Sequence, residues 1–320
     1  MRNQATKVAL VVSLVVQLLA CGAPRPPSPP PAEAHTGFDP IELEMMGDPD
    51  WLAAGFGSIW VKHPEGVVSR IDAATATVTA RIETGTTSSE SCDGIGSGAD
   101  GIWSCSFHDL VLLDPVTDAV VSTIPAGKIP GQGRLVGAAG RVWVLAGEGD
   151  RLIGVSEADK SLSDPIPLPV ACTDLGARAD VLYVVCERAG RVLRVDPVSA
   201  MVTANVPISA PVHVSAASSG VWVASDEGLL RLDPASLETT LTLGDVLIGY
   251  LGAIWADETG VWVRRVDPFL TKVDGTSGVQ TRVITSPLDG GGDVLFDGTH
   301  LWVTDLEHGV LVRMEIPAGP

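Results

Sequence analysis

Short apolar segments built around an aromatic residue recur along this chain at nearly constant intervals. The intervals between successive aromatic residues are 43, 40, 40, 39, 40 and 40 positions. The aromatic residues are Trp60, Trp103, Trp143, Tyr183, Trp222, Trp262 and Trp302. A recurrence of this kind means that one structural unit is repeated seven times.

Each repeat carries the pattern of four short strands. An apolar residue eight positions before the aromatic marks a first strand, and the aromatic itself lies in a second. A third strand runs into an acidic turn, as in LRVDPVS around Asp196, and a fourth follows, as in MVTANVP. Asp, Pro and hydroxyl side chains stabilise such turns. The repeats therefore predict an all-β fold over residues 38–320, a seven-bladed β-propeller of four-stranded antiparallel blades, rather than a helical solenoid.

The last repeat ends too early to supply its own outermost strand. Residues Ile41 to Met45, just before the first blade, alternate apolar and acidic side chains. We expect residues 41–46 to be the outer strand of the last blade and to close the ring. The alternative is a frayed terminal segment, since first residues are often disordered unless they are tied down.

The N-terminal residues have the pattern of an export signal. Arg2 and Lys7 precede an apolar run from Val8 to Ala20, which is shorter than the roughly twenty residues of a membrane-spanning helix. The ending LLAC resembles a bacterial lipobox, which implies that residues 1–21 are a lipoprotein signal and that Cys21 becomes the lipid attachment site. An ordinary cleaved secretory signal is the alternative.

A proline-rich stretch, residues 22–37, separates this signal from the repeats. Its sequence GAPRPPSPPPAEAHTG has almost nothing to bury, and such segments form extended, semi-rigid spacers. The expected domain order is signal, tether and propeller. The expected location is the bacterial cell envelope, on the outer membrane or the cell surface, with the membrane as a partner through the lipid anchor.

Composition supports this picture and narrows the partners. The chain is 45% hydrophobic, has 35 glycines and is only 19% charged, which favours many short strands and turns. Its formal charge is −18, and loss of two basic residues with the signal leaves 19 basic against 39 acidic residues, or −20. An acidic surface repels polyphosphate, so no nucleic-acid partner is expected.

Four cysteines follow the repeat. Cys92 and Cys172 each lie eleven residues before the aromatic of their blade, and Cys105 and Cys186 lie two and three residues after it. Folding the hairpin of the first two strands brings each pair together, which predicts the disulfides Cys92–Cys105 and Cys172–Cys186. Metal binding is the alternative, but no cysteine pair has the two-residue spacing of zinc sites.

Candidate binding residues lie nine positions before the aromatics, where the first strands begin. In a propeller these positions line a funnel around the central channel on one face. Polar or aromatic side chains occupy five of the seven positions. They are Trp51, Arg134, Asp174, His213 and Asp293. Further groups expected on this face are Asp50, Asp93, Thr173, His63, His108, His308 and the pair Arg264 and Arg265. The convergence predicts a ligand-binding site, and the alternative is a channel mouth that is polar only because it is wet.

The sequence of the repeats, such as VWVASDEGLLRLDPASLETTLTLG, resembles that of the YVTN-type and NHL-type propellers and, more distantly, streptogramin lyase. The resemblance implies an extracytoplasmic binding or scaffold module for a protein, peptide or small ligand, without a cofactor or bound metal. The alternative is a metal-assisted lyase or hydrolase with His213 as base and Asp174 or Asp293 near a cation. Asn and Glu, which such metal sites use, are missing from all seven strand starts, so a non-catalytic role is favoured.

Overall fold

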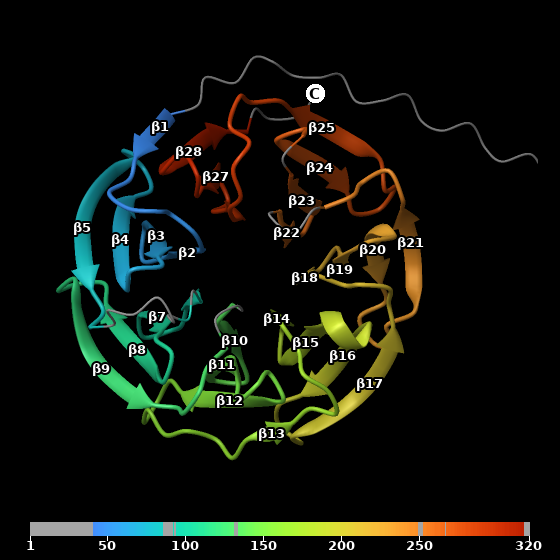
Figure 1. Ribbon diagram of the computed structural model, residues 1–320, viewed down its shortest axis with the longest axis horizontal. Helices are drawn as coiled ribbons and strands as arrows, with labels where there is room; N and C mark the ends of the chain where they lie inside the picture. The colour runs from blue at the N-terminus through green and yellow to red at the C-terminus, as the bar shows by residue number, and fades with distance from the viewer. Residues whose placement is uncertain are drawn as a thin grey trace, which may run out of the picture. The chain divides into compact units, whose positions relative to one another are not determined.

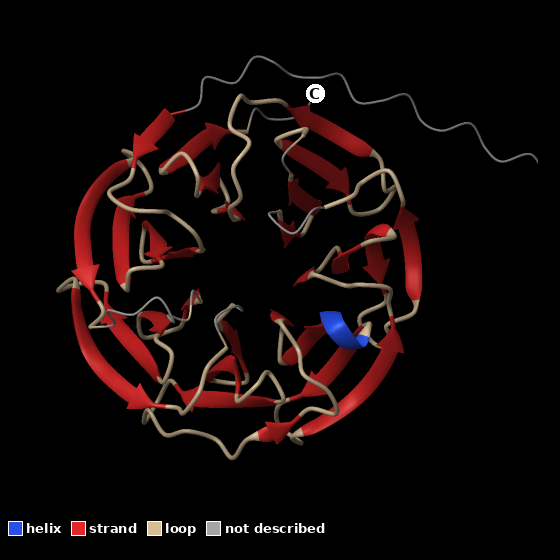
Figure 2. Cartoon of the chain, in the orientation of Figure 1, coloured by secondary structure: helices blue, strands red, loops and turns tan. Residues whose placement is uncertain are grey.

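The described residues form seven four-stranded antiparallel sheets arranged in a ring (Figure 1). The computed structural model describes residues 41–85, 92, 94–130, 134–248, 252–265 and 267–316. Nearly every element is a strand, and a short 3-10 turn in blade 4, η1 (Glu187–Ala189), interrupts them (Figure 2). The predicted seven-bladed propeller is confirmed.

The sheets follow one another along the chain as blades 1 to 7. Blade 1 contains β2 (Leu52–Gly55), β3 (Ser58–His63), β4 (Val67–Asp72) and β5 (Thr77–Glu83). Blade 2 contains β6 (Ile95–Ser97), β7 (Ile102–Cys105), β8 (Asp109–Asp114) and β9 (Ala119–Pro125). Blade 3 contains β10 (Val136–Ala138), β11 (Arg141–Ala146), β12 (Arg151–Ser156) and β13 (Ile166–Pro167). Blade 4 contains β14 (Asp174–Arg178), β15 (Val181–Cys186), β16 (Arg191–Asp196) and β17 (Met201–Pro207).

The remaining blades have the same order. Blade 5 contains β18 (His213–Ala217), β19 (Gly220–Ser225), β20 (Gly228–Leu232) and β21 (Thr239–Leu243). Blade 6 contains β22 (Ala253–Asp257), β23 (Gly260–Arg264), β24 (Leu270–Asp274) and β25 (Gln280–Ile284). Blade 7 contains β26 (Val294–Phe296), β27 (His300–Asp305), β28 (Val310–Glu315) and β1 (Ile41–Glu44).

The hydrophobic core lies between neighbouring blades. The repeat aromatics are at most 2% exposed, and Trp60 of blade 1 packs with Ile95 and Ile102 of blade 2. Outer strands behave differently, because β9 and β17 alternate exposed and half-buried side chains. The repeat aromatics are therefore packing residues, since each fills the space between two sheets.

A basic residue of the third strand covers the aromatic ring in several blades. The cross-strand pairs are Trp60 with Arg70, Tyr183 with Arg194, Trp222 with Arg231, Trp262 with Lys272 and Trp302 with Arg313. The guanidinium of Arg70 lies 5.1 Å from the ring centroid of Trp60. Its Nη1 also donates to the carbonyl of Pro115 at 2.7 Å, in the next blade. Arg70, Arg194, Arg231 and Arg313 thus bond to the next blade, whereas Lys272 bonds to Asp257 in its own blade. The aromatic repeat alone gave no sign of these contacts.

The ring is closed by the N-terminal strand. β1 pairs antiparallel with β28, with Leu43 opposite Leu311, and Figure 1 shows the blue β1 beside the red β28. The predicted closing strand is confirmed, but it ends at Glu44 rather than Met46. Met45 still donates its amide to Gly309 at 2.8 Å, and Gly47 then turns the chain with a φ of 99°.

The predicted signal, Cys21 and the tether lie outside the described residues. Within the part of the chain that the structure describes, no helix is both long and apolar enough to cross a membrane.

Candidate functional site

The five side chains predicted to line the funnel belong to one connected network. They come from blades 1, 3, 4, 5 and 7, and each lies where a first strand begins or just before it. The face of the ring on which the first strands begin and the second strands end is called the funnel face below. The network, together with Trp255, is called the central cluster: Trp51, Arg134, Asp174, His213, Trp255 and Asp293.

Arg134 connects opposite parts of the ring. Its Nη2 lies 2.5 Å from Oδ1 of Asp293, although the two residues are 159 positions apart in sequence. The same nitrogen is 3.5 Å from the carbonyl oxygen of Ile254. One guanidinium therefore links blade 3 to blades 6 and 7 at the centre of the funnel face.

Two tryptophans flank this guanidinium. Its Cζ lies 5.1 Å from the ring centroid of Trp51 and 5.9 Å from that of Trp255. Both distances are within the range of cation–π attraction. The rings are half-buried, whereas the tryptophans of the repeat are almost fully buried. These two indoles therefore pack against the edges of the cores between blades and also present a surface to the site.

Sequence reasoning identified Trp51 and missed Trp255. The chain has eight tryptophans, and six of them occupy the repeat position of the second strands. Trp255 lies in β22, two residues beyond Ala253, where this first strand begins. A tryptophan outside the repeat was therefore the available signal.

His213 links the second acid to the cluster. Its Nδ1 lies 3.6 Å from Oδ2 of Asp174, and its ring centroid is 6.5 Å from that of Trp51 in an edge-on arrangement. Within the described part of the chain, the buried Nε2 of His213 has no hydrogen-bond partner. A buried polar atom without a partner is costly, so this nitrogen is a natural contact point for a ligand.

The two acids also hold neighbouring blades together. Asp293 accepts the amide of Leu52 in blade 1 at 3.1 Å and that of Val294 at 2.8 Å. Asp174 repeats this pattern with Val214 of blade 5 and its own neighbour Leu175, both at 2.9 Å. Each carboxylate therefore joins the first strands of two neighbouring blades. Both acids thus stabilise the ring in addition to lining the site.

Burial dominates the electrostatics of Asp293. The side chain is 2% exposed, and this desolvation raises the pKa of its carboxyl group. The positive charge of Arg134 and the two amide hydrogen bonds act in the opposite direction. Arg134 is therefore the main compensation for placing an acid at this position.

Two other histidines expected on the funnel face, His63 and His108, do not join the central cluster. His63 is fully buried, and its Nε2 shares a 2.8 Å hydrogen bond with Ser69 in its own blade. Burial, followed by the charge of Arg81, lowers the pKa of His63 to about 4. His108 stacks edge-on against Phe107, with ring centroids 4.7 Å apart. His63 therefore makes its contacts within blade 1, and His108 makes its own within blade 2.

A second polar group joins blades 6 and 7. His308 pairs with the buried Asp305 at 2.7 Å, and this hydrogen bond raises the pKa of His308. Arg264 is fully buried, lies 3.5 Å from Asp305 and donates to the carbonyl of Gly290 at 2.5 Å. Arg265 donates to Thr271 at 2.8 Å. Arg264 thus binds the loop that contains Gly290, and Arg265 bonds to a strand of its own blade, whereas Arg134 occupies the centre of the face.

Two further predicted residues have simpler outcomes. Asp50 donates its backbone amide to the carbonyl of Lys62 at 3.0 Å, and Thr173 donates its own to Val185 at 2.7 Å. Asp93 lies outside the described residues. Among the residues that are described, no three His, Cys, Asp or Glu side chains are arranged to hold a metal ion.

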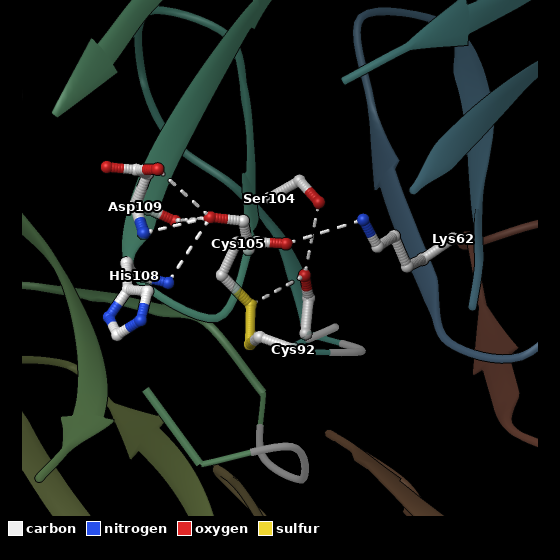
Figure 3. The surroundings of a disulfide bond; sticks show 8 residues. Lys62, Cys92, Ser104, Cys105, His108 and Asp109 are labelled. Carbon is white, nitrogen blue, oxygen red and sulfur yellow. Dashed lines mark hydrogen bonds between the residues drawn. A yellow bond between two sulfur atoms is a disulfide. The ribbon is translucent and has the colours of Figure 1, made fainter. Parts of the chain in front are cut away.

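Both predicted disulfides are present and lie at the ends of second strands. Cys92 is bonded to Cys105 with a Cα separation of 5.4 Å, and Cys172 is bonded to Cys186 with one of 3.7 Å. Figure 3 shows the first of them, with Lys62 of blade 1 donating to the carbonyl of Cys105 at 3.4 Å. The hairpin argument is confirmed, and the disulfides fix the chain just before two of the first strands.

Comparisons with known proteins agree with this architecture. The sequence matches no protein-family model, and a comparison with curated proteins gives no match. Among solved structures, the chain is similar to BamB from Moraxella catarrhalis, with a TM-score of 0.60, 13% identity and coverage of 83% of this chain and 84% of that one. It is also similar to the Pan2 WD40 domain of Neurospora crassa, with a TM-score of 0.69, 8% identity and coverage of 86% and 90%.

Identities this low support the shared fold alone. The fold and its blade count define the class of protein: the chain is a seven-bladed β-propeller with a polar and aromatic cluster at the centre of one face.

Proposed function

We infer that this chain is a non-catalytic binding module of the bacterial cell envelope, a lipoprotein that resembles YVTN-type and NHL-type propellers and holds a protein, peptide or small ligand at the funnel face. One observation carries this inference. Side chains from six blades meet in the central cluster, and among the described residues the buried Nε2 of His213 lacks a hydrogen-bond partner there. Polar and aromatic groups that converge from separate elements are typical of binding sites.

The enzyme alternative is less well supported. It needs Asp174 or Asp293 to bind a cation, whereas both carboxylates accept amides from two blades and Asp293 also binds Arg134. Hard cations require several free oxygen ligands together. A metal-assisted lyase or hydrolase is therefore the second choice.

The path of β1 agrees with anchoring through Cys21. β28 begins on the funnel face, because it follows the turn after β27, and β1 runs antiparallel to it. Ile41 therefore lies at the opposite face. The first described residue of the chain thus lies away from the funnel face, where the ligand is proposed to bind.

Thermal shift on the detergent-solubilised full chain tests the binding function. The ligand set contains envelope peptides, cell-wall fragments, small metabolites and divalent metal ions. We expect one class of organic ligand to raise the melting temperature by mass action, and His213→Ala to abolish the shift. Phe56→Ala, on an exposed turn of the opposite face, is the matched control. A shift produced by metal ions alone and lost in His213→Ala would instead favour the enzyme.

Membrane fractionation tests the anchor separately. The full chain is expected in the membrane fraction of a bacterial host, and Cys21→Ser in the soluble extracytoplasmic fraction. Equal distribution of the two proteins would contradict lipid attachment at Cys21.

A further inference from the structure

The central cluster has the composition of a site that recognises a cation. Two indole rings face a guanidinium at 5.1 and 5.9 Å, and a carboxylate that is 2% exposed binds it. Aromatic rings combined with a desolvated acid are the means by which proteins bind guanidinium and alkylammonium groups. In the free protein the cation is supplied by Arg134.

The groups that hold this guanidinium do not depend on Arg134 for their positions. Trp255 lies within β22, and Asp293 is fixed by the amides of Leu52 and Val294. Trp51 lies at the start of blade 1, where its carbonyl accepts the amide of Lys62 at 2.9 Å. Three rigid blades therefore prepare the position for a cation.

Arg134 itself enters from a different blade. It precedes β10 rather than lying within it, and its side chain reaches across the centre to meet blades 6 and 7. A side chain that enters from outside a prepared position can in principle be replaced by another of the same chemistry.

The charge of the whole chain favours the same class of partner. The formal charge is −18 for the full sequence, so the protein attracts basic molecules at long range. A basic partner that reaches the funnel face meets a position already shaped for its side chains.

We propose that the centre of the funnel face recognises an arginine or lysine side chain of a partner, and that Arg134 occupies this position until the partner displaces it. The proposal rests on the binding function inferred above and specifies its ligand as a cationic side chain. Trp51, Trp255 and Asp293 make the contacts, and Arg134 competes for them.

The competition predicts a gain of affinity when Arg134 is removed. A binding position that is mostly occupied lowers the apparent affinity of an external ligand by the occupied fraction. Arg134→Ala should therefore bind N-acetyl-arginine amide at least about tenfold more tightly than the wild type does. Tryptophan fluorescence of the full chain in detergent reports binding, because Trp51 and Trp255 lie at the position.

Two controls identify the chemistry. N-acetyl-citrulline amide has the same shape without the charge, and it should not bind Arg134→Ala. Adding Asp293→Asn to Arg134→Ala should weaken arginine binding, whereas adding Phe56→Ala, on the opposite face, should leave it unchanged. Equal binding of citrulline and arginine, or equal affinity of the wild type and Arg134→Ala, would overturn the proposal.

Loss of stability in the variant does not remove the test. Where Arg134→Ala is unfolded, methylguanidinium at millimolar concentration should restore its circular dichroism spectrum and urea at the same concentration should not. Arg134→Gln, which keeps most of the side-chain length, provides an independent measurement. The proposal is wrong if methylguanidinium does not restore the fold of an unfolded Arg134→Ala, or if a folded Arg134→Ala or Arg134→Gln does not bind N-acetyl-arginine amide.

These outcomes are separable from those of the binding function. An organic ligand without a positive charge that stabilises the wild type and requires His213 would support the binding module while contradicting the cationic ligand. Binding of arginine by Arg134→Ala does not depend on which natural ligand the thermal-shift experiment finds.

Discussion

At the residue scale, the main energetic question is how a buried acid is tolerated at the centre of the funnel face. Asp293 is 2% exposed and Arg134 is 12% exposed. Removing one partner of a buried ion pair leaves the other charge uncompensated, which costs more than the intact pair contributes. The pair is therefore a sensitive point of the fold as well as the core of the proposed site.

Replacing Arg134 with methionine should expose this sensitivity. We expect Arg134→Met to lower the free energy of unfolding at pH 7 by about 3 kcal/mol, measured by urea denaturation. The raised pKa of Asp293 means that the folded protein binds its proton more tightly than the unfolded chain does. The contribution of Asp293 to stability is therefore most favourable at low pH and falls as the pH rises through that pKa.

The pH dependence and a second substitution check the cause. The deficit of Arg134→Met should shrink as the pH falls, and Asp293→Asn in the same chain should recover part of it at pH 7. Lys128→Met is the matched control, because its partner Glu148 is 75% exposed and surface pairs contribute little. A deficit that is independent of pH would mean that packing, not charge, is lost.

The pKa values of His63 and His308 should be shifted in opposite directions from the ordinary value of a histidine side chain. Burial lowers the pKa of His63 to about 4, whereas the hydrogen bond to Asp305 raises that of His308 above 6.5. His63 thus contributes stability above pH 6.5 that is lost as the pH falls toward 4, and His308 contributes stability below pH 6.5 that is lost as the pH rises through its own pKa.

NMR titration of the two imidazole rings measures these values directly. Asp289→Asn should lower the pKa of His308 only slightly, because Asp289 lies 3.7 Å from Nε2 and Asp305 is the larger cause. Superimposable titration curves for His63 and His308 would contradict the assigned environments.

At the scale of single elements, the third strands carry a feature that the aromatic repeat does not reveal. In five of the described blades, the residue opposite the aromatic is basic. In four of these five blades its charged group lies over the ring. In several blades it also donates to a carbonyl of the next blade, as Arg313 does to Ala74 at 2.8 Å. Blades 2 and 3 have Leu112 and Gly154 at this position instead.

Arg70 offers a direct test of this contact. We expect Arg70→Met to lower the free energy of unfolding by about 1–2 kcal/mol, because it removes a cation–π contact and hydrogen bonds to blade 2. Arg191→Met is the control, because Arg191 bonds to Asn205 within its own blade. Urea denaturation of both variants measures the difference, and equal stability of the two would argue against an inter-blade role.

At the scale of the whole molecule, stability depends on closing the ring. β1 is the outer strand of blade 7, so the first described residues hold the last blade. Leu43 packs in the cluster that contains Ile59, Trp302 and Leu311, which joins blades 7 and 1. The last blade contains strands from both ends of the described chain, so this blade cannot unfold without separating those two ends.

Two residues on the same face of β1, one near its middle and one at its start, make the closure testable. Leu43→Lys should lower the free energy of unfolding by about 2 kcal/mol or more, because it places a charge in an apolar cluster. Ile41→Lys, two residues away and 41% exposed at the start of the strand, should have little effect. Midpoints of urea unfolding compare the two, and equal losses would indicate that β1 contributes no specific packing.

The sequence alone determined the architecture, because a propeller is built from local and repeated patterns. The aromatic spacing, the turn residues and the alternation in Ile41 to Glu44 specify seven blades and their closure, and the hairpin positions of the cysteines specify both disulfides. The same repeat identified five of the six residues of the central cluster, since equivalent positions face the same centre.

Only the tertiary structure decided which of these side chains meet. Arg134 bonds to a residue 159 positions away, Trp255 joins from a deeper position of its strand, and His63 turns into its own blade. The acids serve the blades as well as the cluster, because the amides of Leu52 and Val214 come within reach only when adjacent blades pack. Strand patterns follow neighbours along the chain, whereas contacts across the ring depend on the angle between blades and the reach of each side chain, which no local pattern encodes.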